Sequence, residues 1–431
     1  MRKRSFPQWL GAMVLLVASS TVQGEDWPQW RGPKRDGHSA EKAILDKWPE
    51  DGPKLVWSLT ELDAIGTGYG SPAVVGNRMY IIGADGNKQT AKEFVTCLDL
   101  TTGKQIWRES LAGTTGKYSD GWGGGPRSTP TIDGKFAYVL GSTGDFACLD
   151  TETGKIAWQK NLVSDFGGAI PTWGYSESPL VDGDQVVVTP GSKGGVLALN
   201  KKTGETVWQC KDVTDGAGYS SLMITEVAGV RQYVQQTMAS GIGVRASDGK
   251  LLWKVGGIGR RVAVIPTPVL QDNYVFFTAG YGAGCECFKL EADGEGTKAV
   301  EVYSKNKVVS NHHGGVVRLG DHIYGHSDRL GWVCFPLKTG GEEAVWENKG
   351  VGKGSVTFAN GNLYCYGESS GTIALVKANP EKYEEISKFT IPQTSKLRMP
   401  QGKVWAHPVI ANGKLILRDY ELLFVYDIKA K

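Results

Sequence analysis

A short pattern recurs along the chain with nearly constant spacing, and it constrains the fold more than any other feature of the sequence. Each copy has a small residue, usually an Asp or Asn two positions later, a turn glycine six positions after the small residue, and a Trp four positions beyond the glycine. Five segments carry it: residues 97–107, 148–158, 198–208, 243–253 and, slightly longer, 334–346. From Trp57 the Trp spacings are 50, 51, 50, 45 and 93, the last covering a copy that ends near Tyr303 without a Trp. A period of this size indicates a repeat architecture.

Each copy predicts a pair of antiparallel strands. Alternating apolar residues form the first strand, the Asp or Asn caps the turn with its own side chain, and the glycine supplies the positive φ that the turn needs. A second hairpin precedes each copy, as in residues 71–82 and 128–140. Eight such hairpins begin along the chain, at Ser71, Ser128, Ser178, Ser220, Thr267, Gly314, Ser355 and His407. The pattern therefore predicts eight four-stranded antiparallel units.

The two ends of the repeated region are complementary. The last unit, residues 407–427, runs out of chain before its fourth strand, whereas residues 54–59 resemble a Trp strand that no inner strands precede. Pairing of these two segments would close the units into a ring and remove exposed sheet edges. The chain also has 59 glycines and 14 tryptophans but no helical pattern of useful length. The sequence thus predicts an all-β, eight-bladed β-propeller as a single domain over residues 53–431.

The start of the chain has the features of a secretory signal. Residues 2–4 are basic, residues 9–18 form a short apolar run, and residues 22–24 provide a cleavage site. The run is shorter than the about 20 residues that cross a bilayer, and no Cys follows it directly that could carry a lipid, the first being Cys97. We therefore expect residues 1–24 to be a cleaved signal peptide and residues 25–52 a leader segment. The protein should be periplasmic or secreted, and not membrane-embedded.

Charge and cysteine usage exclude several classes of function. Without the three basic residues at positions 2–4, Lys plus Arg and Asp plus Glu both number 45, so the mature chain has no general attraction for nucleic acid. The seven cysteines are an odd number without CxxC spacing, and the small-residue position of the repeat holds Cys97, Cys148 and Cys334. We expect these cysteines to be packing residues, with no covalent haem and no thiolate metal site.

The repeat resembles the AxDxxTGxxxW docking motif of the quinoprotein-type (PQQ-like) propeller family over most of the mature chain. The leader, with Asp26-Trp-Pro-Gln-Trp-Arg-Gly-Pro33, is similar to a segment common in secreted PQQ-like proteins of planctomycete-type bacteria. The resemblance implies one of two functions. Quinoprotein alcohol dehydrogenases hold PQQ and a divalent cation in the central funnel, whereas BamB-like assembly factors use a similar eight-bladed ring without a cofactor. Both share the motif, so it reports the fold and leaves the function open.

In a propeller, the segments that lead into the innermost strands line one mouth of the axial channel. Here those segments are rich in aromatic and basic side chains and contain one acid. They contribute Tyr69, Trp122, Arg127, Trp173, Tyr175, Glu177, Tyr219, Arg260, Arg261, Asn311, His312, His313, Lys353, Trp405 and His407. Such a group suits an anionic planar ligand or the carboxylate of a peptide. Channel mouths also collect polar and aromatic side chains that bind nothing.

A dehydrogenase needs further parts, and the resemblance assigns only some of them. It requires a donor to the quinone oxygens, a stacking platform, a base and hard oxygen ligands for Ca²⁺. The candidates are Arg127 or Arg261 as donor, Trp173 or Trp405 as platform, Glu177 as catalytic base, and Glu177 with Asn311 as calcium ligands. A second carboxylate is missing from this set, and the adjacent cysteine pair of many family dehydrogenases has no better match than Cys285-Glu286-Cys287.

A metal-binding interpretation is suggested by four histidines close in sequence, His312, His313, His322 and His326. Neighbours in a loop point apart, however, and a spacing of four residues brings two histidines together only on a helix. We therefore expect them to be polar lining or packing residues. The sequence as a whole predicts a monomeric, exported, non-catalytic binding or scaffold module, BamB-like, with a protein, peptide or small anionic planar ligand at the mouth. The alternative is a PQQ- and Ca²⁺-dependent dehydrogenase that oxidises an alcohol or sugar.

Overall fold

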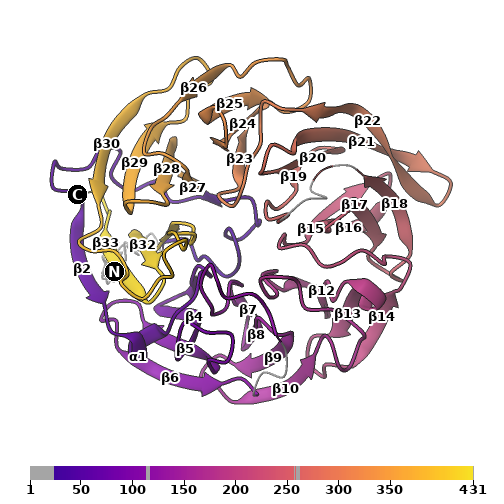
Figure 1. Cartoon of the computed structure of the whole chain (residues 1–431), viewed down its shortest axis with the longest axis horizontal. Coiled ribbons are helices and arrows are strands. Elements are labelled where there is room, and N and C mark those ends of the chain that lie inside the picture. Colours follow the sequence, from indigo (N-terminus) through magenta and orange to yellow (C-terminus); the bar gives the residue numbers. More distant parts are fainter. Residues whose placement is uncertain (1–23, 113–116, 257, 259–262, 431) are drawn as a thin grey trace, which may run out of the picture.

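The computed structural model describes residues 24–112, 117–256, 258 and 263–430. It confirms the all-β ring: eight four-stranded antiparallel sheets, the blades, surround one axis (Figure 1), and the two-residue strand β1 (His38–Ser39) adds to one of them. Helix in the described part of the chain is limited to α1 (Leu62–Ile65) and a 3-10 turn at Ser192–Gly194. The expected signal peptide lies outside the described residues apart from Gly24.

Each blade is a meander whose strands follow one another from the axis outward. Blades 1 to 4 comprise β3 (Ala73–Val75), β4 (Arg78–Ala84), β5 (Glu93–Asp99), β6 (Gln105–Ser110); β7 (Thr131–Asp133), β8 (Phe136–Leu140), β9 (Asp145–Asp150), β10 (Ile156–Asn161); β11 (Leu180–Asp182), β12 (Gln185–Val188), β13 (Val196–Asn200), β14 (Thr206–Cys210); and β15 (Met223–Val227), β16 (Val230–Gln236), β17 (Ser240–Arg245), β18 (Leu251–Gly256). Blades 5 to 7 comprise β19 (Val269–Gln271), β20 (Tyr274–Ala279), β21 (Gly284–Asp293), β22 (Gly296–Asn306); β23 (Val316–Leu319), β24 (His322–Ser327), β25 (Gly331–Pro336), β26 (Trp346–Asn348); and β27 (Gly354–Ala359), β28 (Asn362–Gly367), β29 (Thr372–Lys377), β30 (Glu385–Thr390).

Blade 8 is assembled from both ends of the repeated region. Its first three strands are β31 (Val409–Ala411), β32 (Lys414–Asp419) and β33 (Leu422–Asp427), and its fourth is β2 (Lys54–Leu59). β2 pairs antiparallel with β33, from Lys54 opposite Asp427 to Leu59 opposite Leu423. The strand that lacks inner partners in the sequence thus closes the ring, as predicted.

The recurring Trp joins most blades to the next. Trp107 of blade 1 donates its Nε1–H to the carbonyl oxygen of Thr151 in blade 2 at 3.0 Å, and a Cβ on Gly154 would lie 2.6 Å from the same indole. The glycine of the repeat is therefore required both by its positive φ and by the ring that covers it. The other bonds of this kind come from Trp57, Trp158, Trp208, Trp346 and, in the copy without a Trp, Tyr303.

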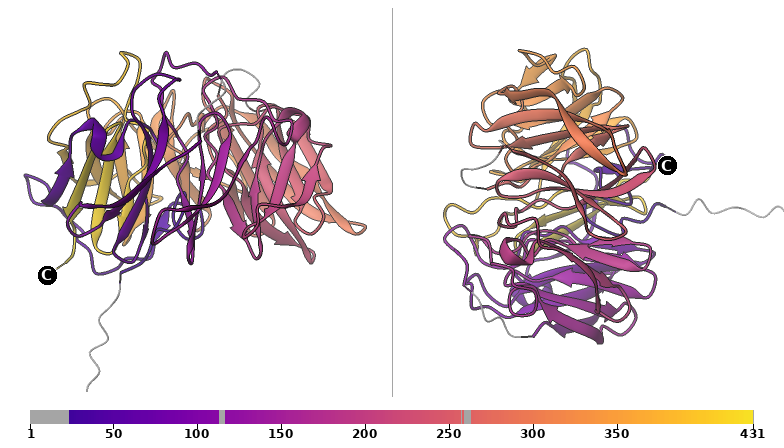
Figure 2. Two further views of the ribbon diagram at one scale, coloured as in Figure 1. Left: turned by 90° about the horizontal axis from the view of Figure 1, so that it is seen from below. Right: turned by 90° about the vertical axis from the view of Figure 1, so that its right-hand side faces the viewer.

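Trp253 of blade 4 departs from this arrangement. Its Nε1–H donates to Oε1 of Gln232 in its own blade at 2.7 Å. The next blade carries a long hairpin, with 10 residues in β21 and 11 in β22, and its end projects beyond the rim of the ring (Figures 1 and 2). A Cβ on Gly294, in the turn of that hairpin, would meet no atom within 4 Å. In most of the other blades, the turn between the third and fourth strands packs against the Trp of the preceding blade. In blade 5 this turn lies farther out, at the end of the long hairpin.

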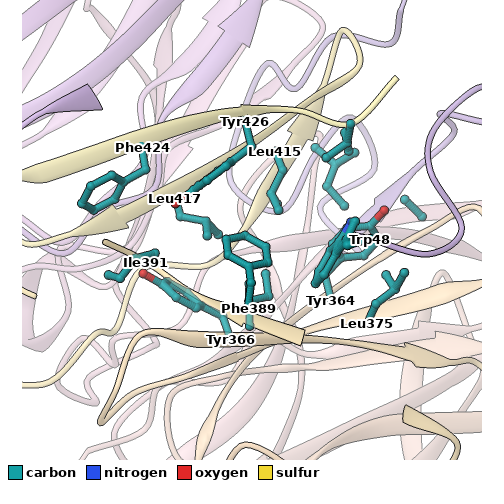
Figure 3. Close-up of a cluster of buried hydrophobic side chains, with 14 of the residues drawn as sticks. Trp48, Tyr364, Tyr366, Leu375, Phe389, Ile391, Leu415, Leu417, Phe424 and Tyr426 are labelled. Atoms are coloured by element: carbon teal, nitrogen blue, oxygen red, sulfur yellow. The ribbon is translucent and has the colours of Figure 1, made fainter. Parts of the chain in front are cut away.

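Apolar side chains fill the space between neighbouring blades. Figure 3 shows the core between blades 7 and 8, which contains Tyr364, Tyr366, Leu375, Phe389, Ile391, Leu415, Leu417, Phe424 and Tyr426. Trp48 of the leader packs into it, with its ring centroid 5.0 Å from Phe389 and 5.6 Å from Tyr364. The seven cysteines are all buried and unpaired, which confirms that they are packing residues.

The leader runs into the axial channel at the end opposite the predicted mouth. Gly76, in the turn after the inner strand β3, donates its N–H to Asp26 Oδ1 at 2.8 Å. Asn412, in the turn after β31, donates its N–H to the Glu25 carbonyl at 3.3 Å. From there the chain crosses toward the centre of the ring, where its indigo trace is visible in Figure 1, and returns at β1, which pairs parallel with the end of β27.

The leader contacts every blade. Trp27 exchanges two backbone hydrogen bonds with Val74 of blade 1, each 2.8 Å, and the Pro28 carbonyl accepts from Ile132 N of blade 2. Arg35 reaches blades 3 and 4, Trp30 blade 5 and Arg31 blade 6. β1 pairs with blade 7, and Leu45 N donates to the Ile428 carbonyl beside blade 8. The leader therefore closes this end of the channel.

Candidate functional site at the channel mouth

Four aromatic side chains lie in contact at the mouth and are called the mouth cluster: Tyr69, Trp122, Trp405 and Tyr420. The ring centroid of Tyr69 lies 4.8 Å from that of Trp405 and 4.9 Å from that of Tyr420, and Trp122 lies 6.3 Å from Trp405. The Tyr69 hydroxyl donates to the Trp122 carbonyl at 2.8 Å. Tyr69 is buried, whereas Trp122 is 45% exposed, so the cluster presents an indole to solvent on a fixed base.

The glycine-rich loop of Trp122 is packed tightly against the cluster. Gly123 has a φ of +113°, and a Cβ there would lie 2.1 Å from the Tyr69 hydroxyl. Arg127 donates to the carbonyls of Gly123 at 2.8 Å and Gly125 at 3.0 Å, and its guanidinium lies 5.3 Å from the Tyr69 ring centroid. The cation–π contact and the two hydrogen bonds fix Arg127 against Tyr69 and the loop that carries Trp122.

Histidines and carboxylates continue the mouth on the side of blades 5 to 7. Glu368 Oε2 accepts from Trp405 Nε1 at 3.3 Å and lies 3.5 Å from His313 Nδ1. Lys353 Nζ lies 2.6 Å from Asp328 Oδ1, and His312 Nε2 lies 2.8 Å from the Tyr281 hydroxyl. Because Lys353 is paired with an acid, its charge is largely compensated within the protein.

Burial keeps the histidines of this region neutral. Desolvation is the main cause that lowers the pKa of His312 and of His326 to about 4, and it lowers the pKa of His313 well below its usual value. Burial also raises the pKa of Glu368. At neutral pH the described part of the mouth therefore carries less charge than its sequence suggests, and Arg127 is a cation in contact with the mouth cluster.

His407 connects the mouth with the leader below it. Its Nε2 lies 3.1 Å from the His313 carbonyl, and its ring centroid lies 4.6 Å from that of Trp30. Burial, followed by the nearby charge of Arg31, lowers the pKa of His407 to about 3. His407 is thus a buried, neutral packing residue between the mouth and the leader.

Trp173 and Tyr219 form a second aromatic pair across the mouth. Their ring centroids are 5.7 Å apart, and the Trp173 backbone N–H donates to the Tyr219 hydroxyl at 3.3 Å. Among the direct ring contacts of the described residues, none joins this pair to the mouth cluster. Trp173 is half-buried, so it offers a separate apolar surface for a ligand.

Two other predicted mouth residues point into the protein instead. Tyr175 is fully buried in the core between blades 2 and 3, where its hydroxyl donates to the Pro190 carbonyl at 2.8 Å. Glu177 is buried as well; its carboxylate accepts from Thr189 N at 2.6 Å and from Gln235 Nε2 at 3.0 Å, and burial raises its pKa to about 8. A segment that leads into an inner strand alternates its side chains between channel and core, and the sequence does not say which residue faces which.

The residues assigned to PQQ and calcium do not form a common site. Asn311 is buried beside blade 6, with its amide donating to the carbonyls of Gly315 and His326, and it shares no hydrogen-bond partner with Glu177. Within the described part of the chain, no three His, Cys, Asp or Glu residues converge as a metal site. Of the two predicted donors, Arg127 is bonded to the carbonyls of Gly123 and Gly125, whereas Arg261, like its neighbour Arg260, lies outside the described residues. Among the described candidates, Glu177 and Asn311 therefore do not fit a shared calcium site.

Four mouth residues are missed from the sequence: Tyr281, Asp328, Glu368 and Tyr420. Each lies in the turn between the second and third strands of a blade. In a four-stranded meander those turns lie at the same end as the segments that lead into the inner strands. That topological rule is the signal that would have identified them, and it supplies the carboxylates that the predicted set lacks.

Comparison with known proteins agrees with the fold and identifies the protein family. The family profile described as outer membrane protein assembly factor BamB matches residues 91–348. BamB of Yersinia pestis is 23% identical over 377 residues, which cover 85% of this chain and 86% of that protein. BamB of Kangiella koreensis is 26% identical over 220 residues, and this chain matches about half of its length, 48%.

Solved structures of BamB and of a quinohemoprotein alcohol dehydrogenase share the propeller fold. BamB from Moraxella catarrhalis aligns with a TM-score of 0.59 at 17% identity and covers 88% of this chain and 98% of its own. The quinohemoprotein alcohol dehydrogenase from Comamonas testosteroni aligns with a TM-score of 0.65 at 13% identity and covers 94% of this chain and 81% of its own. At these identities the likeness shows the fold. No helix in the described residues combines the length and the apolar character needed to cross a membrane.

Proposed function

Because this chain belongs to the family of the outer membrane protein assembly factor BamB, we propose that it is an exported, non-catalytic binding module. The mouth cluster with Arg127 is the binding surface, and the partner is a segment of another protein. The observation that carries this proposal is Trp122, an indole 45% exposed on a loop that Tyr69 and Arg127 hold in place. Trp and Arg are the side chains that contribute most binding energy in protein interfaces.

The charge of the mouth supports a protein partner over a strongly anionic small ligand. Lys353 is paired with Asp328, burial lowers the pKa of His312 and His313, and Glu368 adds an acid near Trp405. Among the described residues, what remains is an aromatic surface with the fixed guanidinium of Arg127. Such a surface suits an apolar or aromatic segment with an acceptor, such as a carboxylate, beside it.

A capture experiment with matched variants tests this function. Residues 25–431, immobilised, are exposed to a cell-envelope extract in the original form, as Trp122→Ala and as Ile106→Ala. Ile106 is 44% exposed on the outer strand β6, so it controls for loss of an exposed apolar side chain away from the mouth. A protein retained by the original and Ile106→Ala forms, and lost with Trp122→Ala, supports the proposal. Equal retention by all three forms, or no retained protein, contradicts it.

The dehydrogenase alternative has less support from the site. The neutral, buried histidines and the separate positions of Glu177 and Asn311 offer no shared set of oxygen ligands for Ca²⁺. Calorimetric titration of PQQ into residues 25–431, with and without Ca²⁺, distinguishes the two functions. No binding heat is expected in either case. Stoichiometric, Ca²⁺-dependent binding at micromolar or lower Kd would replace the binding-module proposal with the enzyme.

A further inference from the structure

A cavity of about 190 Å³ lies between the leader and blades 4 to 6, toward the end of the channel that the leader closes. Its apolar walls are inner-strand residues, among them Met223, Val269 and Leu270. Its charged lining comes mainly from the leader, which contributes Arg31, Lys34, Arg35, Asp36 and His38, with Arg318 from β23. The cavity is thus a second candidate site, separate from the mouth.

The four cations of this lining have no acidic partner in contact. Among the described residues, no carboxylate lies within ion-pair distance of Arg31, Lys34, Arg35 or Arg318. Arg31 donates to the carbonyls of Val316 at 2.5 Å and Asp36 at 3.1 Å. Arg35 donates to the carbonyls of Leu222, Pro179 and Ser178 and to Gln29 Oε1.

Two buried nitrogen atoms of the lining also lack a partner. They are Arg31 Nε and His38 Nε2. Arg31 is only 4% exposed, and a buried donor without an acceptor destabilises the protein. An acceptor that entered the cavity could satisfy such a donor, and a charged acceptor would do so most strongly.

The acids nearby compensate only part of the positive charge. Asp36 accepts from His38 N at 3.1 Å, and its charge raises the pKa of Arg31 against the larger effect of burial, which lowers that pKa to about 10. Glu177 acts on Arg35 in the same way. Four cations face one acid in the lining, on a mature chain whose basic and acidic residues are equal in number.

We propose that this cavity binds a small oxyanion, a phosphate or carboxylate group. Guanidinium groups bind such groups with paired hydrogen bonds. Two cations of the lining, Lys34 of the leader and Arg318 of β23, do not hold the leader in place. Within the described part of the chain, the Arg318 guanidinium donates only to the nearby Gly320 carbonyl at 3.0 Å, and Lys34 is exposed. The volume, against about 30 Å³ for a water molecule, accommodates a phosphate or a small carboxylic acid.

In a purely structural role, the arginines of the lining would only hold the leader against the blades. Arg35 fits that role fully, because each of its hydrogen bonds closes the leader onto blades 3 and 4. Lys34 and Arg318 do not, so a test on those two residues separates ligand binding from fastening. Replacing Arg31 or Arg35 would disturb the leader itself and would not separate the two roles.

The test is calorimetric titration of inorganic phosphate, and separately of citrate, into residues 25–431 at constant ionic strength. We expect saturable binding of one anion per chain, weakened at least tenfold in the double variant Lys34→Gln/Arg318→Gln. Lys42→Gln, an exposed leader lysine outside the cavity, should bind as the original does. The phosphate and citrate arms distinguish a phosphate ligand from a carboxylate ligand.

Two results would overturn the site: no saturable binding of either anion, or equal binding by the double variant. Trp122→Ala should bind the anion as the original protein does, because Trp122 belongs to the mouth. Failure of this site therefore leaves the proposed protein partner untouched, and failure of the capture experiment leaves the anion site untouched. Circular dichroism and the unfolding midpoint of each variant confirm that the fold is kept.

Discussion

The two ends of the axial channel are built from the same eight blades but are finished by different means. At the mouth, loops and turns of the blades themselves present an exposed Trp122 beside Arg127, and the histidines are neutral. At the other end, a segment outside the repeat fills the channel with Trp27, Trp30, Arg31 and Arg35, nearly all of them buried. The difference shows that the repeat produces the ring, while residues that do not repeat give each end its chemistry.

If the proposed function holds, this contrast places stability at one end and recognition at the other. The leader contacts all eight blades, in part through buried side chains, so changes to those side chains should lower the free energy of unfolding. Exposed side chains of the mouth contact few groups, so changes there should spare stability and alter binding. Four substitutions test the contrast.

Trp27→Ala should have the largest effect. Trp27 is 1% exposed, packs with the core of blades 8 and 1, and pairs with β3. Truncation of a buried Trp costs about 3–5 kcal/mol. The measurement is denaturant unfolding followed by Trp fluorescence, and a loss below about 1 kcal/mol would mean that the leader is not an integral part of the fold.

Arg35→Met should follow. The substitution keeps much of the side-chain volume but leaves three buried carbonyls, those of Ser178, Pro179 and Leu222, without their donor. We expect a loss of about 2–4 kcal/mol. Arg35→Lys should recover little of it, because an ammonium cannot replace the planar fork of donors. Full recovery with Lys would contradict the hydrogen-bonding account and point to charge alone.

His407→Phe should change the pH dependence of stability. The pKa of His407 is lowered from 6.5 to about 3 in the folded protein, so between these values the unfolded chain binds a proton that the folded chain does not. His407 therefore makes the protein lose stability as the pH falls through this window. Phe keeps a ring against Trp30 and cannot be protonated, so the midpoint of unfolding should fall less steeply in acid. An unchanged slope would show that His407 is not the group responsible.

At neutral pH the same variant should lose about 1 kcal/mol, because the His313 carbonyl loses its bond to His407. The measurement is thermal unfolding in a series of buffers from about pH 4 to pH 8. The change in stability at pH 8 reports the lost hydrogen bond. The further change between pH 8 and pH 4 reports the protonation of His407.

Trp122→Ala should have the smallest effect on stability. The side chain is 45% exposed, and the link that Tyr69 makes to this loop goes to the Trp122 backbone carbonyl, which Ala keeps. A change within about 0.5 kcal/mol is expected, together with loss of the captured partner. A loss comparable to that of Trp27→Ala would remove the contrast between the two ends.

The ring itself was predictable because it rests on repeated, local signals. The Gly and Trp of each repeat predict the turn and the docking strand, and the mismatch between residues 54–59 and 407–427 predicts closure. Even the copy without a Trp keeps the geometry, since Tyr303 donates to the Leu337 carbonyl as a Trp would. Such features depend on short-range spacing, which a sequence displays directly.

The two ends were less predictable because they depend on contacts that do not repeat. Tyr175 and Glu177 belong to a mouth segment by position, but their side chains enter the core between blades. Arg31 and Arg35 look like exposed charges of a polar leader, yet they are buried against carbonyls. Those carbonyls belong to residues 143 and 285 positions away in the chain. No local sequence pattern predicts such distant contacts.

The pairing of β2 with β33 also sets the order in which the molecule can form. These strands join residues 54–59 to residues 423–427, so the fourth strand of blade 8 cannot find its partner until nearly the whole chain has emerged. Topologies dominated by such distant pairings fold slowly, and they expose unpaired strand edges meanwhile. The ring is thus completed late, and a chain cut before β33 would retain two open edges prone to aggregation.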